Sequence, residues 1–378
     1  MDINLTELDE LYQASINQRR QQVGADSIGW GILGASYMAE HWMVNAIRHQ
    51  PAALHAPAMA GSWTVAIYSH NEWRAQQFAQ ANQIPHACVN VDDLLNRREI
   101  QCVYISSHPR HHFPLTMAAL AAGKHVLCET PLALTVEDAQ TMQRAADNRG
   151  LLLAVNHARR TAPALLQLRA LLANQTIGDV LGGRISNTTL LPPQFQTWRL
   201  QGNGGGVLFD RTIHSLDLLR FLLDDEITEV MAVSGQQFLS EQATMRSPVL
   251  VEEDVLSTVR MAHRNLTFQL HDSFVVPHLP TSVEIYGTAG TLVARGVLNE
   301  HEDSELRLLH NQQYTVKPLA LINAYWQLIY HFNATVRQQS SIPTTPQLAT
   351  AIDGIKSLAA ALAMRQAIHA HTPVQLKA

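Results

Sequence analysis

A carboxylate and an imidazole stand four residues apart near the middle of the chain, directly after three glycines. Asp210 and His214 follow glycines 204–206 at the start of a predicted helix, and the i, i+4 spacing puts both on one helical face. A carboxylate beside an imidazole stabilises the protonated ring and can orient it. His214 is therefore a candidate general acid for the oxygen of a carbonyl that undergoes hydride addition. The alternative is a buried helical pair without chemistry.

A second set of residues has the spacing of a dinucleotide-binding turn. The literal pattern G-x-G-x-x-G occurs at Gly29, Gly31 and Gly34. The first glycine of that fingerprint makes the turn directly after a strand, whereas Gly29 and Gly31 lie inside the apolar run 28–33. We therefore prefer a register that starts at Gly34, with the backbone of Ser36 approaching the pyrophosphate and Ala39 at the close-packing position. The expected pyrophosphate residues are Gly34, Ala35, Ser36, Tyr37, Met38 and Ala39. The alternative is an ordinary strand–turn–helix.

The end of the second predicted strand indicates which dinucleotide is bound. An NAD-binding chain usually has Asp or Glu here to hold the ribose 2′-hydroxyl. The segment 66–74, "AIYSHNEWR", has no acidic residue directly at the strand end and offers Ser69, His70 and Arg74. A hydroxyl and a guanidinium suit a 2′-phosphate, so NADP(H) is the expected cofactor. Arg74 has a competing interpretation as a solvated helix residue.

These residues require two kinds of domain to position them. Apolar runs at 28–33, 63–69, 102–107, 125–129 and 151–156 alternate with helical patterns, which predicts a doubly wound parallel α/β domain of the Rossmann type. After residue 157, helical patterns at about 162–174 and 212–223 precede many alternating runs, which predicts an α+β domain with a large, mainly antiparallel open sheet. Two further helices are expected from about residue 319. The expected divisions are an extension at 1–27 and domains at 28–155 and 156–378.

Composition excludes several classes of function. The formal net charge is −5 and no basic stretch stands out, so neither nucleic acid nor a membrane surface is an expected partner. No apolar run approaches a membrane span, and the N-terminus lacks the pattern of a signal peptide. Three sparse cysteines favour a reducing compartment, and we expect a cytoplasmic protein.

Two clusters of basic side chains stay ambiguous from the sequence. His108, His111 and His112 crowd one loop, but no carboxylate or cysteine accompanies them, so no metal is expected. Arg159 and Arg160 have two interpretations, as contacts to a substrate or as solvated residues.

In their order, several segments resemble the Gfo/Idh/MocA family of oxidoreductases. They are "WGILGASYMAEHW", "VYISSHPRHH", "GKHVLCETPLALT", "IGDV" and "GGGVLFDRTIHSLDLLRFLL". The resemblance implies a small-molecule substrate, a nicotinamide held between the two domains, and a homodimer or higher homo-oligomer made through the open sheet. It also implies that the cofactor or substrate contacts Ser106, Ser107, His108, His112, Glu129, Thr130, Asn156, Trp198, Arg199 and Tyr325.

The chain departs from this family at one catalytic position. The family signature Glu-Lys-Pro, whose lysine binds the reacting oxygen, is Glu129-Thr130-Pro131 here. Lys124 lies at the opposite end of the same predicted strand, ~16 Å away by the rise per residue. The other lysines, at 317, 356 and 377, match no catalytic position of the family.

Three interpretations follow from the threonine. The first is an NADPH-dependent reductase of a cyclic ketose or related carbonyl, with Thr130, Asp210 and His214 as its catalytic set. The second is an altered family member that reduces an imine or iminium. The third is a non-catalytic NADP-binding regulatory or interaction protein.

Overall fold

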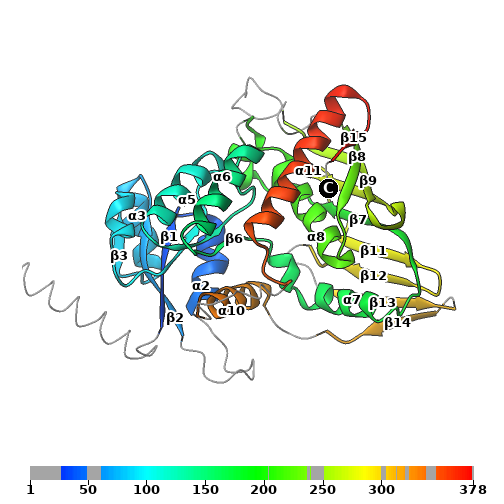
Figure 1. Cartoon of the computed structure of the whole chain (residues 1–378), viewed down its shortest axis with the longest axis horizontal. Coiled ribbons are helices and arrows are strands. Elements are labelled where there is room, and N and C mark those ends of the chain that lie inside the picture. The colour runs from blue at the N-terminus through cyan, green and yellow to red at the C-terminus, as the bar shows by residue number, and fades with distance from the viewer. Residues whose placement is uncertain are drawn as a thin grey trace, which may run out of the picture. The chain divides into compact units, whose positions relative to one another are not determined.

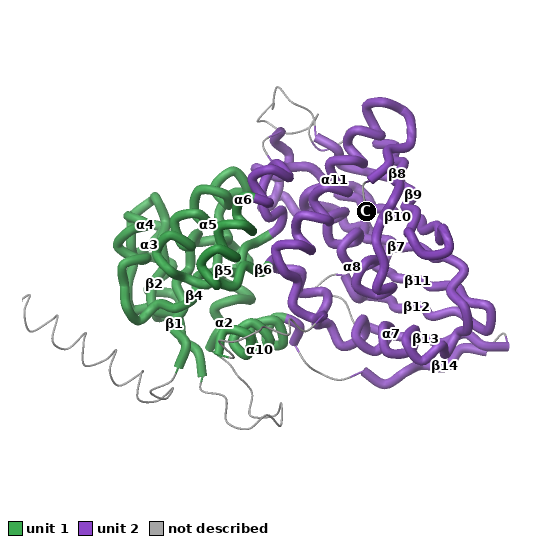
Figure 2. Tube along the Cα trace, viewed as in Figure 1, with its two compact units in different colours: residues 1–129, 141–154, 325–345 green, residues 130–140, 155–324, 346–378 purple. Residues whose placement is uncertain are grey.

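The chain folds into two compact units. The computed structural model describes residues 27–48, 61–202, 204–235, 239, 251–298, 304–311, 313–319, 323–337 and 346–376. The first unit comprises residues 1–129, 141–154 and 325–345, and the second comprises 130–140, 155–324 and 346–378 (Figure 2). Relative to the expected division at 155, segment 130–140 belongs to the second unit and segment 325–345 to the first. The predicted extension, 1–27, lies outside the described residues apart from Ser27.

The first unit is built on a six-stranded sheet with the order β3-β2-β1-β4-β5-β6 (Figure 1). Its strands are β1 Ile28–Leu33, β2 Ser62–Tyr68, β3 His86–Cys88, β4 Cys102–Ile105, β5 His125–Cys128 and β6 Leu153–Val155. The helices around it are α2 Val44–Arg48, α3 Glu72–Ala81, α4 Val91–Leu95, α5 His112–Ala121, α6 Val136–Asp147 and α10 Ala324–Arg337. The pairs β1–β2, β1–β4, β2–β3 and β4–β5 are parallel, which confirms the Rossmann-type prediction.

The central strands are apolar because both of their faces are buried. All six residues of β1 are buried, and so are the first six of β2. The sequence did not predict β3, which is three residues long, or the five-residue helix α4. Elements this short carry too little periodicity to be recognised.

Helix α10, from the C-terminal part of the chain, is joined to this sheet by a buried polar chain. Trp30 Nε1 donates to Asn333 Oδ1 at 3.2 Å, and Asn333 Nδ2 donates to Ser62 Oγ at 3.1 Å. Ser62 Oγ in turn donates to the carbonyl of Ile47 at 2.6 Å. The Trp30 and Phe332 rings lie 4.9 Å apart between centroids. These contacts explain why α10 belongs to the first unit.

The second unit is built on a nine-stranded sheet with the order β14-β13-β12-β11-β7-β10-β9-β8-β15. Its strands are β7 Val180–Thr188, β8 Ile227–Ser234, β9 Asp254–Met261, β10 Thr267–Ser273, β11 Ser282–Gly287, β12 Thr291–Arg295, β13 Glu305–His310, β14 Gln313–Lys317 and β15 Val374–Gln375. Its helices are α7 Pro163–Ala173, α8 Ile213–Leu223 and α11 Ala351–Ala370. Among the described strands only the central pair β7–β10 is parallel, so the predicted mainly antiparallel sheet is confirmed.

The two faces of this sheet differ. Alternate residues of β9 and β10 are buried, and helices α7 and α11 contact the sheet. On the opposite face, in the described part of the chain, several large apolar side chains are exposed, namely Met231, Val233, Leu256, Tyr286, Tyr314 and Val316. We call these six residues the open face.

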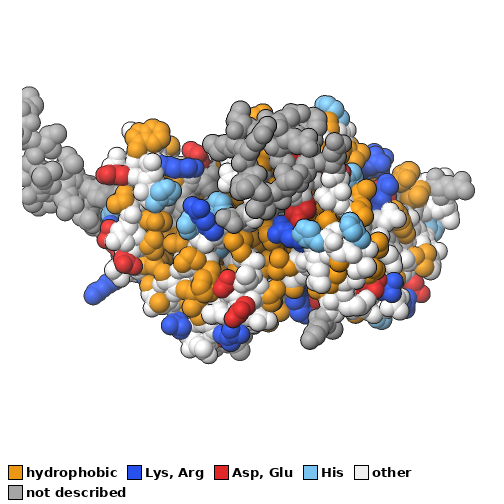
Figure 3. Space-filling model, turned by 90° about the horizontal axis from the view of Figure 1, so that it is seen from above, with side chains coloured by type: hydrophobic (Ala, Val, Ile, Leu, Met, Phe, Trp, Pro, Cys, Tyr) orange, Lys and Arg blue, Asp and Glu red, His pale blue; other side chains and the backbone are white. Residues whose placement is uncertain are grey.

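Within the described ranges, no helix is long and apolar enough to cross a membrane. On the part of the molecule visible and not covered by grey atoms in Figure 3, basic and acidic side chains are interspersed, and no large area carries one charge sign.

Replacing Asn333 by leucine tests the buried polar chain beneath β1. The substitution leaves the Trp30 indole N–H and the Ser62 hydroxyl without their buried partner, which costs about 1–3 kcal/mol of unfolding free energy. Chemical denaturation of the variant measures this loss. Gln77→Ala, at an exposed position of α3, is the control and is expected to leave stability unchanged. Equal stability of the Asn333 variant and the control contradicts the prediction.

Candidate functional site

Gly34 makes the turn that follows β1. Its φ is +120°, and a Cβ at this position would lie 2.7 Å from the backbone nitrogen of Ser107, so a side chain is excluded. Gly29 and Gly31 lie inside β1, as the sequence predicted. The literal G-x-G-x-x-G match is therefore coincidental, and the chain that leaves β1 passes close to the end of β4.

The segment after Gly34 turns directly into a helix. Ser36 Oγ accepts a hydrogen bond from the backbone nitrogen of Ala39 at 3.1 Å. The first turn, Ala39–Met43, is π-helical and continues into α2, with Met38 immediately before it. Tyr37 is exposed, and its ring stacks on that of His41 at 3.8 Å.

Arg74 reaches back from α3 to this turn. Its Nε and Nη2 donate to the carbonyl of Ala35 at 3.1 and 2.7 Å. Ser69 is buried at the end of β2, and its hydroxyl accepts from the backbone nitrogen of Asn71 at 3.3 Å, while His70 beside it is exposed. The Arg74 guanidinium is therefore not merely solvated, and it lies against the glycine turn.

The loop after β4 uses its polar side chains for local structure. Ser106 Oγ donates to the carbonyl of Gly34 at 2.8 Å, and His112 Nε2 lies 3.0 Å from the carbonyl of Ser107. His108 Nδ1 accepts from the backbone nitrogen of Arg110 at 3.2 Å. Burial, with the nearby Arg110 charge, lowers the pKa of His108 to about 4. Among the described residues, no group of three or more His, Cys, Asp and Glu side chains is arranged to hold a metal ion.

The remaining predicted cofactor residues are divided between the two units. In the first unit, Glu129 accepts a hydrogen bond from the Tyr104 hydroxyl, and the Tyr325 ring stacks on Trp42 at 5.6 Å. In the second unit lie Asn156, which is buried, and the neighbours Trp198 and Arg199, with the Arg199 guanidinium 4.6 Å from the Trp198 ring centroid.

Thr130 and His214 meet within the second unit. Thr130 Oγ1 lies 3.1 Å from His214 Nε2. The other ring nitrogen of His214, Nδ1, lies 3.2 Å from Nδ1 of His157, and the two rings are nearly perpendicular at 81°. The predicted catalytic pair of Thr130 and His214 is therefore in contact, and a second histidine stands behind it.

The role of Asp210 as the partner of His214 stays a prediction, and the structure adds a partner that the sequence did not predict. Asp210 Oδ1 accepts from Arg199 Nε at 2.7 Å, so Arg199 balances its charge. Burial, followed by the influence of His157 and Arg159, lowers the pKa of His214 to about 3, and the charge of Asp210 acts in the opposite direction. The ring is therefore neutral near pH 7.

Residues Leu208–Thr212 form a π-helical turn before α8 begins, and the sequence carries no clear signal of this turn. Residues four apart stay near one face across a π turn as they do in an α-helix, so the turn does not by itself separate Asp210 from His214. What the sequence did not predict is Arg199, eleven residues before Asp210, as the partner of its carboxylate.

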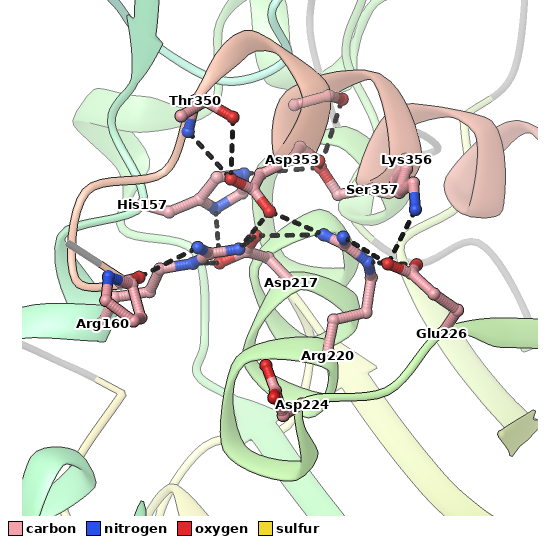
Figure 4. Close-up of polar contacts among 12 residues, drawn as sticks. His157, Arg160, Asp217, Arg220, Asp224, Glu226, Thr350, Asp353, Lys356 and Ser357 are labelled. Atoms are coloured by element: carbon pink, nitrogen blue, oxygen red, sulfur yellow. Dashed lines mark hydrogen bonds and ion pairs between the residues drawn. The ribbon is translucent and has the colours of Figure 1, made fainter. Parts of the chain in front are cut away.

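Behind the histidines lies a network of buried charges (Figure 4). Arg160 is 5% exposed, so neither of its predicted roles, in substrate contact or solvated, is correct. Its Nε and Nη2 donate to Asp217 at 2.8 and 2.6 Å, and Nη2 lies 2.9 Å from Asp353 Oδ1. Asp217 Oδ2 is 3.6 Å from His157 Nδ1.

The network continues through α8 and α11. Arg220 donates to both carboxylate oxygens of Glu226 and to Asp353, and Lys356 donates to Glu226 at 2.7 Å. Although burial opposes it, the charge of Arg160 lowers the pKa of Asp353 to about 2. Asp217 and Asp353 were not predicted as members of a buried charge network, because their partners lie far away in the chain. The position of Asp217, three residues after His214 on the same helix, was the available signal.

The lysines lie where the sequence places them. Lys124 Nζ donates to the carbonyls of Arg97 and Ile100, at the amino end of β5, which confirms the predicted position. Lys356 is paired with Glu226, and Lys317 ends β14. Lys377 lies outside the described residues.

Two family models match the chain. One, described as an oxidoreductase family with an NAD-binding Rossmann fold, covers residues 28–157, and the GFO/IDH/MocA C-terminal domain covers residues 165–293. Among solved structures, levoglucosan dehydrogenase in complex with NADH and levoglucosan has a TM-score of 0.81 at 21% identity, covering 93% of this chain and all of that one. The aldose-aldose oxidoreductase of Caulobacter crescentus has a TM-score of 0.79 at 21% identity, with the same coverage. These two likenesses show the fold.

A curated relative is more similar in sequence. The 1,5-anhydro-D-fructose reductase of Ensifer adhaerens is 33% identical over 340 residues, which is 89% of this chain and 95% of the relative. Together with the two family models, this likeness along nearly the whole length shows that the chain belongs to the Gfo/Idh/MocA family of oxidoreductases.

Proposed function

We propose that the protein is an NADP(H)-dependent oxidoreductase that transfers hydride to or from a cyclic sugar ketone or a related small carbonyl. The observation that carries this proposal is the contact between the Thr130 hydroxyl and the His214 imidazole. The likeness to 1,5-anhydro-D-fructose reductase supports the substrate class.

The residues of the first unit fit an NADP(H) molecule. Gly34 makes the close turn after β1, where a Cβ would collide with the Ser107 backbone, and the segment after it turns directly into a helix whose amino end would offer backbone N–H groups to a pyrophosphate. Ser69 and Arg74 lie beside that turn and offer a hydroxyl and a guanidinium to a 2′-phosphate. When bound, the nicotinamide would supply or accept the hydride.

His214 and Thr130 would handle the proton of the reacting oxygen. Because the His214 ring is neutral near pH 7, its nitrogen lone pair is available to a proton from an alcohol that is oxidised, and the low pKa makes it a weak base in the absence of substrate. In the direction of carbonyl reduction, a proton must first reach the ring. Thr130 offers a hydrogen bond to the oxygen without the charge of a lysine.

One observation favours an alternative. An uncharged Thr130 beside a neutral His214 provides no cation for a developing alkoxide. An imine or iminium substrate needs less of this help, and a non-catalytic NADP-binding protein needs none. Both remain candidates on this scaffold.

We also propose a homodimer or higher homo-oligomer built through the open face. Its exposed apolar side chains on β8, β9, β11 and β14 are typical of a surface that another protein covers. A cytoplasmic location stays a prediction, and the buried free thiols of Cys88, Cys102 and Cys128 agree with a reducing compartment.

Arg74→Ala tests the choice of cofactor. Loss of a charge-assisted contact to the 2′-phosphate is expected to weaken NADP(H) binding about 10–100-fold and to leave NAD(H) binding unchanged. Isothermal titration calorimetry with both dinucleotides measures this, and Arg98→Ala, at an exposed position, is the control. Equal affinity for both dinucleotides in the wild type would exclude the proposed preference.

His214→Ala and substitutions of Thr130 test the catalytic pair. Removing His214 is expected to lower turnover by ~10²–10⁴-fold while NADPH affinity stays unchanged. Thr130→Val is expected to lower turnover, and Thr130→Ser, which keeps the hydroxyl, to preserve it. Thr130→Lys is expected to raise turnover of sugar ketones. NADPH oxidation against a panel of sugar ketones and imines measures these rates.

The same assay separates the alternatives. Turnover restricted to imines supports the altered enzyme. A wild-type protein that binds NADPH tightly and turns over no substrate, with His214→Ala changing neither property, supports a binding protein and rules out the catalytic proposal.

A double substitution on the open face tests the oligomer. Val233 and Leu256 are cross-strand partners on β8 and β9 and are both about half exposed. Lysine at both positions is expected to convert the oligomer into a monomer, because it would bury charge in an apolar contact. Light scattering at micromolar concentration measures the mass, with Gln77→Lys on α3 as the control. A monomeric wild type contradicts this proposal.

A further inference from the structure

Four hydroxyl and imidazole side chains form one continuous hydrogen-bonded series in the second unit. It runs from Ser357 in α11 through His157 and His214 to Thr130. His157 is 1% exposed and Ser357 is fully buried, so water does not compete for the bond between them, whereas His214 and Thr130 are half-buried. Figure 4 shows His157 between the Ser357 hydroxyl and the Asp217 carboxylate.

Ser357, at the buried end of the series, determines which atom donates and which accepts in each of its hydrogen bonds. The Ser357 hydroxyl has one proton, and it donates to the backbone carbonyls of Asp353 at 3.0 Å and Gly354 at 3.2 Å. Its oxygen therefore acts as an acceptor toward His157 Nε2, which lies 3.4 Å away. In a neutral ring only one nitrogen carries a proton, so a proton on Nε2 of His157 leaves Nδ1 as an acceptor.

The Asp217 carboxylate does not reverse this order. A carboxylate would favour a proton on the nitrogen that faces it, but Oδ2 of Asp217 stands 3.6 Å from His157 Nδ1, beyond hydrogen-bond distance. Both carboxylate oxygens already accept from Arg160, at 2.8 and 2.6 Å. Burial lowers the pKa of His157, which keeps the ring neutral beside this paired charge.

The contact between the two histidines then allows one arrangement. The two Nδ1 atoms are 3.2 Å apart, so one of them must carry the proton between them. We propose that His157 is a positioning residue that holds His214 in the tautomer protonated on Nδ1, so that the bare Nε2 of His214 accepts from the Thr130 hydroxyl.

This arrangement determines what His214 can do, and the catalytic consequence rests on the proposed function. In the oxidation of an alcohol, a bound NADP⁺ would accept the hydride from the substrate carbon as the O–H bond of the substrate breaks. Because the Thr130 hydroxyl faces Nε2 of His214, the substrate proton would pass to the Thr130 oxygen while the Thr130 proton passes to Nε2. The resulting imidazolium donates through Nδ1–H to His157, with the Asp217 carboxylate behind that ring. The role of His157 thus resembles that of the group that orients a catalytic base.

The tautomer can be observed directly in the whole protein. Long-range ¹H–¹⁵N spectra of ¹⁵N-histidine-labelled protein distinguish Nδ1–H from Nε2–H rings, and loss of one signal set in His214→Asn assigns that residue. We expect His214 to be protonated on Nδ1 in the wild type. A wild-type His214 protonated on Nε2 overturns the proposal.

Substitutions of His157 and Ser357 test the cause. His157→Leu removes the acceptor and is expected to shift His214 toward the Nε2–H tautomer, whereas His157→Asn places an amide oxygen near the former Nδ1 and is expected to restore the wild-type tautomer. Ser357→Ala removes the hydroxyl that faces His157 Nε2 and keeps both imidazole rings in place. It provides the same test if the leucine variant does not fold. His369→Leu, on the exposed end of α11, is the control. An unchanged His214 tautomer in every folded variant at positions 157 and 357 also overturns the proposal.

Kinetics separate this proposal from the proposed function. His157→Leu is expected to lower kcat for alcohol oxidation on the order of 10–10²-fold, with the asparagine variant recovering most of it and NADP⁺ affinity unchanged. If the wild type has no activity, the proposed function fails, and the ring spectra still decide the tautomer.

Discussion

The buried salt bridge between Arg160 and Asp217 is the interaction on which the polar interior of the second unit depends. Removing two charges from water costs several kcal/mol per ion unless each is paired and hydrogen-bonded. Here Arg160 makes a bidentate contact with Asp217 and also contacts Asp353. Asp353 in turn contacts Arg220. Three cations thus balance three carboxylates. The cations are Arg160, Arg220 and Lys356, and the carboxylates are Asp217, Glu226 and Asp353. Because the balance involves α8, α11 and the turn that carries Arg160, it fixes these elements together and holds His157 against His214.

Burial is the main reason why the histidines are neutral, because it disfavours the charged imidazole. The Asp217 carboxylate opposes this at His157, but Arg160, which is paired with Asp217, favours the neutral ring. Asp210, near His214, is paired with Arg199 in the same way. Thr130 adds no charge on its side of the His214 ring. An uncharged residue at position 130 and a neutral His214 are consistent with each other, since a cation at 130 would depress the proton affinity of the ring still further.

The sequence predicts those features that depend on neighbours in the chain. The role of Gly34 was predicted because a turn directly after an apolar strand needs a residue without a Cβ. The position of Lys124, at the far end of its strand from Thr130, was predicted because five residues of strand have a fixed length. The errors arise where distant segments decide. Asp210 pairs with Arg199, which the sequence did not predict, and the π turn at Leu208–Thr212 was not predicted either. The role of Arg160 depends on Asp353, nearly two hundred residues away, and the place of α10 depends on Trp30 meeting Asn333.

Thr130 stands at a point where the chain passes from one unit to the other. Glu129 belongs to the first unit and accepts from Tyr104, whereas Thr130 belongs to the second and contacts His214. The contacts that shape the nucleotide turn, from Arg74 to Ala35 and from Ser106 to Gly34, all lie within the first unit. A change of side chain at position 130 therefore acts on the polar series of the second unit and leaves those contacts intact. Thr130 therefore shapes the polar contacts of His214 without a cost to the turn at Gly34, because the two are built from separate sets of hydrogen bonds.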